Sequence, residues 1–127
     1  MKNLLAFAAA SEATTGVALA IAPSLGGWLL LGVELTGVSV PVARVAGFAL
    51  IALGLACWPG RDASNTLSRA LGAMLCYGLL ATLYLGYVAV RSEWVGVLLW
   101  PAVALHAALT LLLTRACLKN QKSKKGV

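Results

Sequence analysis

Glu12 and His106 are the two ionisable residues that lie near the middle of long apolar stretches of this chain. A charged side chain at the centre of a bilayer costs about 3 kcal/mol or more unless it is paired. Counted from Leu4 and from Arg115 at about 1.5 Å per helical residue, the two lie about 12 Å and about 14 Å from the same membrane face. We therefore expect them to meet and to share a proton, as a proton- or cation-binding site or as a structural clasp between helices.

Two further polar residues complete the predicted proton- or ligand-binding site of Glu12, His106, Thr15 and Tyr77. Thr15 lies within about one helical turn of Glu12, and its alternative role is a hydroxyl bond to its own helix backbone. Tyr77 falls in the third apolar segment. Our specific hypothesis for this tyrosine is that it lines a groove that binds a quinone or another aromatic ligand. His106 is also a possible haem ligand, but one chain supplies a single histidine, so we predict no cofactor.

The elements that position these residues are apolar segments of membrane-spanning length. The 127 residues are 61% hydrophobic and 11% charged, whereas soluble domains are about 25% charged. The charges cluster between apolar runs, which is typical of membrane proteins. We predict an all-α, up-down four-helix bundle, a single transmembrane domain over 1–127, with spans at about 4–22, 41–58, 67–90 and 93–114.

Two prolines predict local irregularities. Pro23 ends the first span, and the Gly-broken stretch 23–40 then begins with a short interfacial helix over 23–31. The alternative is one tilted helix from residue 4 to residue 31 with a proline kink. Pro101 lies inside the fourth segment, where it predicts a kink, and Ser92 is the expected cap of that segment.

The basic residues indicate a membrane orientation. Four spans place both termini on one side, and eight of the ten Lys and Arg residues fall on that side. The positive-inside rule then predicts an inner-membrane, multi-pass protein with both termini cytoplasmic. The tail 115–127 is expected to meet anionic headgroups rather than nucleic acid. On the other side, Glu34 and Arg44 form a predicted polar pair at the outer interface.

Several classes of protein lack support in the sequence. The three cysteines show no CxxC spacing and no Cys/His cluster, so we predict neither a disulfide framework nor a metal site. The motifs of nucleotide-binding proteins, zinc peptidases and serine hydrolases are missing, which leaves enzymatic activity uncertain and leaning towards none.

Two resemblances bear on function. The layout, with ARVAGFALIALGLACW at 43–58, resembles the DoxX-like group of small four-helix bacterial inner-membrane proteins. That resemblance implies a helical bundle and, for some members, a subunit of a quinone-linked oxidoreductase. SEATTG at 11–16 is locally similar to the first helix of small multidrug-resistance transporters, whose intramembrane Glu exchanges protons for cations. The third and fourth segments depart from that second family.

The leading hypothesis is a non-catalytic accessory subunit or binding module that associates with itself or with a larger membrane complex. Its motivation is small size, close-packing small residues and the lack of enzyme motifs. The alternatives are a dimeric proton-coupled small-molecule transporter that uses Glu12, and a quinone- or haem-associated redox subunit.

Overall fold

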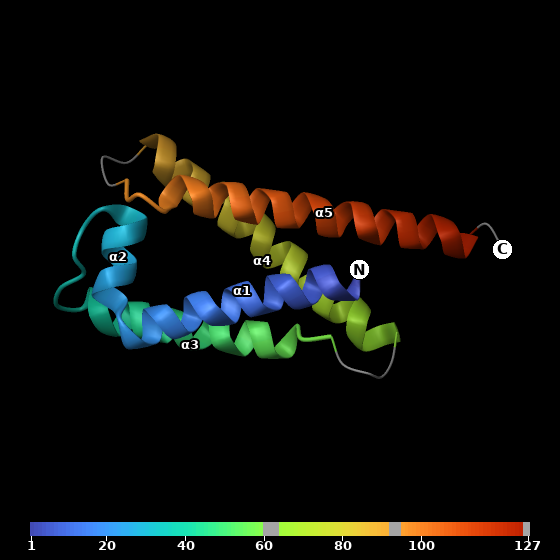
Figure 1. Cartoon of the computed structure of the whole chain (residues 1–127), viewed down its shortest axis with the longest axis horizontal. Coiled ribbons are helices and arrows are strands. Elements are labelled where there is room, and N and C mark those ends of the chain that lie inside the picture. Colours follow the sequence, from blue (N-terminus) through green and yellow to red (C-terminus); the bar gives the residue numbers. More distant parts are fainter. Residues whose placement is uncertain (60–63, 92–94, 126–127) are drawn as a thin grey trace.

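The computed structural model describes residues 1–59, 64–91 and 95–125, without the side chains of 64–67, 120 and 122–125. The described residues form helices and loops only. The helices are α1 (Lys2–Ile21), α2 (Pro23–Leu31), α3 (Ser39–Ala56), α4 (Ser64–Arg91) and α5 (Leu99–Lys125) (Figure 1). By length and composition, α1, α3, α4 from Ser68 and α5 to Lys119 can each cross a membrane. The chain therefore has the makeup of a multi-pass membrane protein, as the sequence predicts.

The four long helices form two packed pairs rather than an evenly packed bundle. In the first pair, α1 and α3 run antiparallel and side by side (Figure 1). Glycine brings them close, because a β-carbon on Gly47 would lie 2.6 Å from the carbonyl oxygen of Gly16. A β-carbon on Gly54 would likewise lie 2.6 Å from the carbonyl oxygen of Ala9. Such small-residue contacts are typical of helices that associate in lipid.

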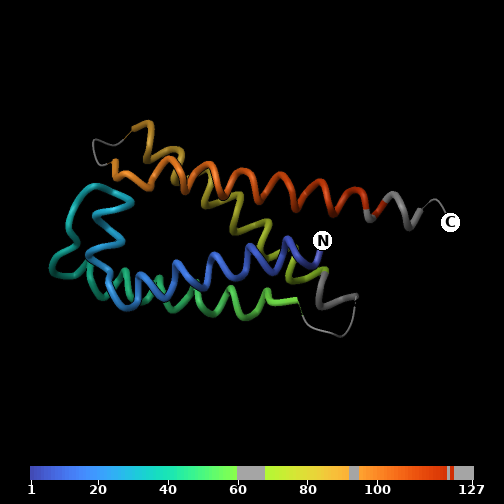
Figure 2. The backbone as a smooth tube through the Cα atoms, viewed as in Figure 1, coloured from blue at the N-terminus to red at the C-terminus, as the bar shows by residue number. Residues whose placement is uncertain are grey.

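The second pair, α4 and α5, crosses at an angle, and α4 passes behind α1 and α5 in this view (Figure 2). The two pairs join through one apolar core, here called the terminal core, which lies towards the end of the molecule that holds Lys2. Its buried residues are Leu5, Ala8, Ala9, Cys57, Ala70, Leu71, Met74, Leu109 and Leu113. Elsewhere the pairs make few contacts, so the helices diverge away from this core.

Helix α2 turns away from α1 and reaches towards α5 (Figure 1). The chain breaks at Ala22, and Pro23 occupies the first position of α2, where its missing N–H costs nothing. At the other end Gly32 adopts a left-handed conformation with φ of 70°. The structure thus confirms a separate short helix and excludes a single kinked helix from residue 4 to residue 31.

A backbone clasp joins α2 to the segment that leads into α5. The N–H of Gly96 donates to the carbonyl of Leu30 at 3.0 Å, and the N–H of Leu98 donates to the carbonyl of Leu29 at 2.8 Å. These bonds are needed because unpaired backbone groups are costly in an apolar environment. Gly96 permits the contact, since a β-carbon there would collide with the carbonyl oxygen of Leu29.

Two expectations for the fourth span are wrong. The helix begins at Leu99 rather than at residue 93, and the expected cap Ser92 lies outside the described residues. Pro101 consequently sits in the first helical turn, which tolerates proline without a kink. The helix also continues to Lys125, so most of the predicted basic tail 115–127 is helical.

Candidate functional site

The side chains of Glu12 and His106 meet between α1 and α5, as their equal depth predicts. Nε2 of His106 lies 3.2 Å from Oε1 of Glu12, and the Glu12 residue is 4% exposed. The distance is that of an ion pair, although the ring nitrogen is not aligned for a hydrogen bond with the carboxylate. Whether the pair works as a site or as a clasp stays a prediction.

The second ring nitrogen of His106, Nδ1, has a hydrogen-bond partner on its own helix. Nδ1 lies 2.7 Å from the carbonyl oxygen of Ala102, and a carbonyl oxygen can only accept, so Nδ1 carries a hydrogen. Nε2 therefore faces Glu12 either as a lone pair or as an N–H. One proton between Nε2 and Oε1 gives either two neutral groups or an ion pair, both with zero net charge.

Tyr77 of α4 packs against this pair. Its ring centroid lies 6.0 Å from that of His106, with the two planes inclined at 61° in an edge-to-face contact. Tyr77 also lines the cleft described below, together with Glu12 and His106. Three helices thus each contribute one side chain to a single polar cluster, which contains three of the four predicted site residues.

Thr15 has a different environment. Its hydroxyl donates to the backbone carbonyl of Ser11 at 2.9 Å, which is the alternative role expected for it from the sequence. Thr14 makes the same kind of bond to Ala10 at 2.8 Å. Both side chains are exposed on the surface of α1, and both line the cleft described in the next paragraph. Thr15 therefore lies near Glu12, but the described contacts include no hydrogen bond between the two side chains.

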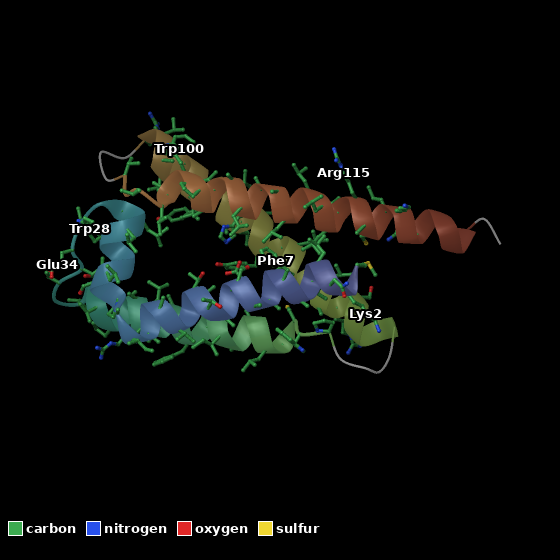
Figure 3. The ribbon with its side chains drawn as sticks, in the orientation of Figure 1. Lys2, Phe7, Trp28, Glu34, Trp100 and Arg115 are labelled. Atoms are coloured by element: carbon green, nitrogen blue, oxygen red, sulfur yellow. The ribbon has the colours of Figure 1, made fainter. Side chains whose placement is uncertain are left out.

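A cleft of about 490 Å³ opens beside the polar cluster. Its walls come from all five helices, chiefly from α1, α2 and α5, and its polar residues are Glu12, Thr14, Thr15, Tyr77 and His106. The rest of its lining is apolar, with leucines from every helix. In Figure 3 the labelled Trp28 of α2 and Trp100 of α5 lie towards the end of the molecule far from Lys2. The cleft is the part of the molecule where the two helix pairs diverge.

A second, very small cavity lies on the other side of Glu12. Its volume is about 10 Å³, close to the space that one water molecule requires, and Gly78, His106 and Thr110 line it. Within the described part of the chain, Nε2 of His106 and Oγ1 of Thr110 are buried without a hydrogen-bond partner. Gly78 leaves room for the Thr110 hydroxyl, because a β-carbon on Gly78 would lie 2.5 Å from Oγ1 of Thr110. Thr110 was not predicted from the sequence, although it lies one helical turn after His106.

The predicted outer pair of Glu34 and Arg44 is not brought together. Both side chains are described and exposed, and no ion pair joins them. Glu34 lies in the loop after α2 and points away from the molecule, far from the labelled Lys2 (Figure 3). No group of three or more potential metal ligands gathers anywhere in the residues that the structure describes.

Comparisons with known protein families, curated proteins and solved structures found no match to this chain. The resemblance to the DoxX-like group therefore remains an expectation from the sequence.

Proposed function

We propose that this protein is a small inner-membrane binding module that takes up a small, largely apolar molecule in the cleft beside Glu12 and His106. The observation that supports the proposal is that the cleft and the buried Glu12–His106 pair lie in the same place. The cleft volume lies within the range of about 300–1,000 Å³ that small-molecule sites occupy. The buried acid and its histidine line that same cleft.

The placement of the pair favours a site over a clasp. A purely structural clasp needs only enclosure between helices, whereas here Glu12, Tyr77 and His106 all face the cleft. The His106 side chain is 15% exposed, so a molecule in the cleft can touch it. Intramembrane ionisable residues that line a cavity are typical of ligand or proton sites.

Proton-coupled transport is the second candidate, because access to the pair is unequal on its two sides. The cleft opens beside Glu12 on the α2 side. On the opposite side the terminal core places Leu5, Met74 and Leu113 between the pair and the chain ends. An acid that is accessible from one side and sealed from the other is the arrangement that alternating access requires in one of its two states.

A quinone- or haem-associated role has less support. Nδ1 of His106 contacts the Ala102 carbonyl, and Nε2 is buried 3.2 Å from Glu12 without an aligned hydrogen bond. An iron–histidine bond would require one of these contacts to break. Such a group fits the observed histidine geometry poorly.

The cleft itself is tested by filling it. Leu105 lines the cleft, and Leu105→Trp should displace any molecule that copurifies in mild detergent, as measured by native mass spectrometry. Leu80→Trp is the matched control, because Leu80 is 61% exposed and does not line the cleft. Equal ligand retention by both variants contradicts the proposal. A bound molecule that only Leu105→Trp loses supports it.

The membrane setting belongs to the same proposal. We place both termini in the cytoplasm, the basic end of α5 against anionic headgroups, and the protein in a homo-oligomer or larger complex. The charge distribution supports this orientation. Reporter fusions after Lys2 and after Lys125 should both give the cytoplasmic signal, and a periplasmic signal from either one excludes the orientation. Native mass spectrometry of the same sample gives the oligomeric state.

A further inference from the structure

Thr110 differs from the other helical threonines whose side chains the structure describes. Each of the others donates its hydroxyl to the backbone carbonyl four residues earlier, at 2.7–2.9 Å, namely Thr14, Thr15, Thr82 and Thr114. Oγ1 of Thr110 is buried and has no hydrogen-bond partner among the described residues. A threonine in a helix commonly satisfies its hydroxyl on its own backbone. The orientation of Thr110 therefore points to a different partner.

Nε2 of His106 is a second buried polar atom of this kind. His106 precedes Thr110 by four residues, so both side chains lie on one face of α5. Nε2 is buried, and its 3.2 Å separation from Oε1 of Glu12 lacks the alignment of a hydrogen bond. Buried polar groups almost always have a partner, because an unpaired one loses its hydration without compensation. Two such atoms one helical turn apart indicate a partner that they share.

The small cavity supplies the space for that partner. Its polar lining comes from Glu12, His106 and Thr110, and the rest of its lining is apolar. Its volume of about 10 Å³ is close to that needed for one water molecule and is too small for a larger ligand. Gly78 of α4 keeps this space open, because a β-carbon on Gly78 would collide with the Thr110 hydroxyl.

From these observations we infer that the small cavity binds a single water molecule, which bridges His106, Thr110 and Glu12. Three polar partners are the usual number for a buried water. Water also fits both protonation forms of the pair, because it donates to Nε2 when that atom is a lone pair and accepts when it is an N–H. Ca²⁺ and Mg²⁺ fit poorly, since each takes about six or more oxygen ligands.

The role of this water is to position the acid and the histidine. It joins α1 to α5 beside the terminal core and holds the Glu12 carboxylate and the His106 ring from the side away from the cleft. The inference does not rest on the proposed binding function, because the small cavity and the cleft are separate spaces.

Thr110→Val tests the inference by the sign of its effect. Valine has nearly the shape of threonine but carries a methyl group in place of the hydroxyl. If the hydroxyl binds the water, the variant removes one of three partners and should lower the midpoint of thermal unfolding in detergent. If the hydroxyl has no partner, the same change removes an unpaired polar group and raises the midpoint. Thr82→Val is the matched control, because the partly buried Thr82 hydroxyl bonds to the Gly78 carbonyl, and its midpoint should not fall as far.

The water itself is detectable by solid-state NMR at His106. Because the chain has one histidine, ¹⁵N-histidine labelling gives ring signals that belong to His106 alone. The protein, deuterated at carbon, is reconstituted in liposomes, and magnetisation is transferred from water protons to the ring at short mixing times. We expect a signal at Nε2 in the natural protein, since this buried atom then contacts the bound water. Thr110→Val should weaken the signal by about half or more.

Three further variants locate the water. Gly78→Ala places a β-carbon beside the Thr110 hydroxyl and should abolish the Nε2 signal. Gly72→Ala is the control on the same helix, because a β-carbon there meets nothing within 4 Å, and it should keep the signal. Leu105→Trp fills the cleft rather than the small cavity and should also keep the signal.

Every other result overturns the inference. Absence of the Nε2 signal in the natural protein, or its survival in Gly78→Ala, shows that the small cavity holds no water. A signal that Leu105→Trp removes comes from water in the cleft. A Thr110→Val midpoint equal to or above that of the natural protein shows that the hydroxyl has no water partner, and this variant decides the matter if Gly78→Ala fails to fold. The copurification test of the cleft is independent of all these results, so the proposed function stands or falls separately.

Discussion

Gly16 of α1 and Gly47 of α3 touch backbone to backbone. A β-carbon built on Gly16 would lie 2.5 Å from the Gly47 carbonyl oxygen, and the reverse distance is 2.6 Å. No real β-carbon approaches an oxygen so closely, and these carbonyl oxygens belong to the backbone and cannot rotate away. The first helix pair therefore depends on the absence of these two side chains.

Gly16→Ala should separate α1 from α3 and lower the free energy of unfolding by about 1–3 kcal/mol, the usual cost of overpacking. The measurement is thermal or denaturant unfolding in detergent. The matched controls are Gly72→Ala and Gly86→Ala on α4, where a β-carbon meets nothing within 4 Å. Since alanine favours a helix over glycine by about 1 kcal/mol, the controls should be neutral or slightly stabilised. Equal destabilisation at Gly16 and Gly72 would contradict the close contact.

The coupling between Glu12 and His106 is measurable by a double-mutant cycle. Glu12→Gln and His106→Gln each remove one partner, so the double variant should lose about 1 kcal/mol less than the two single losses added together. Unfolding in detergent at neutral pH gives the change in the free energy of unfolding for each single variant and for the double variant. Additivity within about 0.3 kcal/mol would show that the observed 3.2 Å contact contributes no stability.

The clasp between α2 and the start of α5 is testable by hydrogen exchange. Gly96→Ala forces a β-carbon against the Leu29 carbonyl and should break both backbone bonds of the clasp. The amides of residues 96 and 98 should then exchange at least tenfold faster. Gly37→Ala is the control, because Gly37 has φ of 56° but open space around it. Its strain of about 1–2 kcal/mol should leave those two amides protected.

Cys57 and Cys117 should differ in reactivity. Cys57 is 1% exposed, contacts the Ala70 carbonyl oxygen at 3.5 Å and belongs to the terminal core. Burial raises the pKa of the Cys57 thiol, which keeps it protonated and therefore a poor nucleophile. In single-cysteine variants, N-ethylmaleimide should label the half-buried Cys117 in the folded protein and Cys57 only after unfolding. Rapid labelling of folded Cys57 would show that the core is open.

Sequence reasoning found the long helices and the central pair because both follow from strong physical constraints. Lipid demands an apolar stretch of fixed length, and helical rise converts residue number into depth. Residue numbers alone were therefore enough to place Glu12 and His106 at the same depth. The break after Ala22 followed from Pro23 for a similar reason, since proline cannot continue a helix without losing a bond.

The missed features depend on contacts between distant segments. Residues 95–98 continue the apolar pattern of the fourth span, so hydropathy could not show that their backbone pairs with α2 instead of forming helix. The Glu34–Arg44 pair was inferred because both residues fall at the outer interface, but exposed charges are hydrated and gain little from pairing. Thr110 was overlooked because a lone threonine in a helix usually bonds to its own backbone.

Helix α5 is longer than the hydrocarbon core of a bilayer is thick. Its 27 residues extend about 40 Å, against about 30 Å of hydrocarbon, so its basic end forms a rigid rod beyond the membrane. Arg115 and Lys119 are fixed to the same rod as His106. Under the proposed contact with anionic headgroups, the attraction of these cations would act on the vertical position of His106 opposite Glu12. A change in the surface charge of the membrane would then shift this rod along its axis and adjust the alignment of the pair.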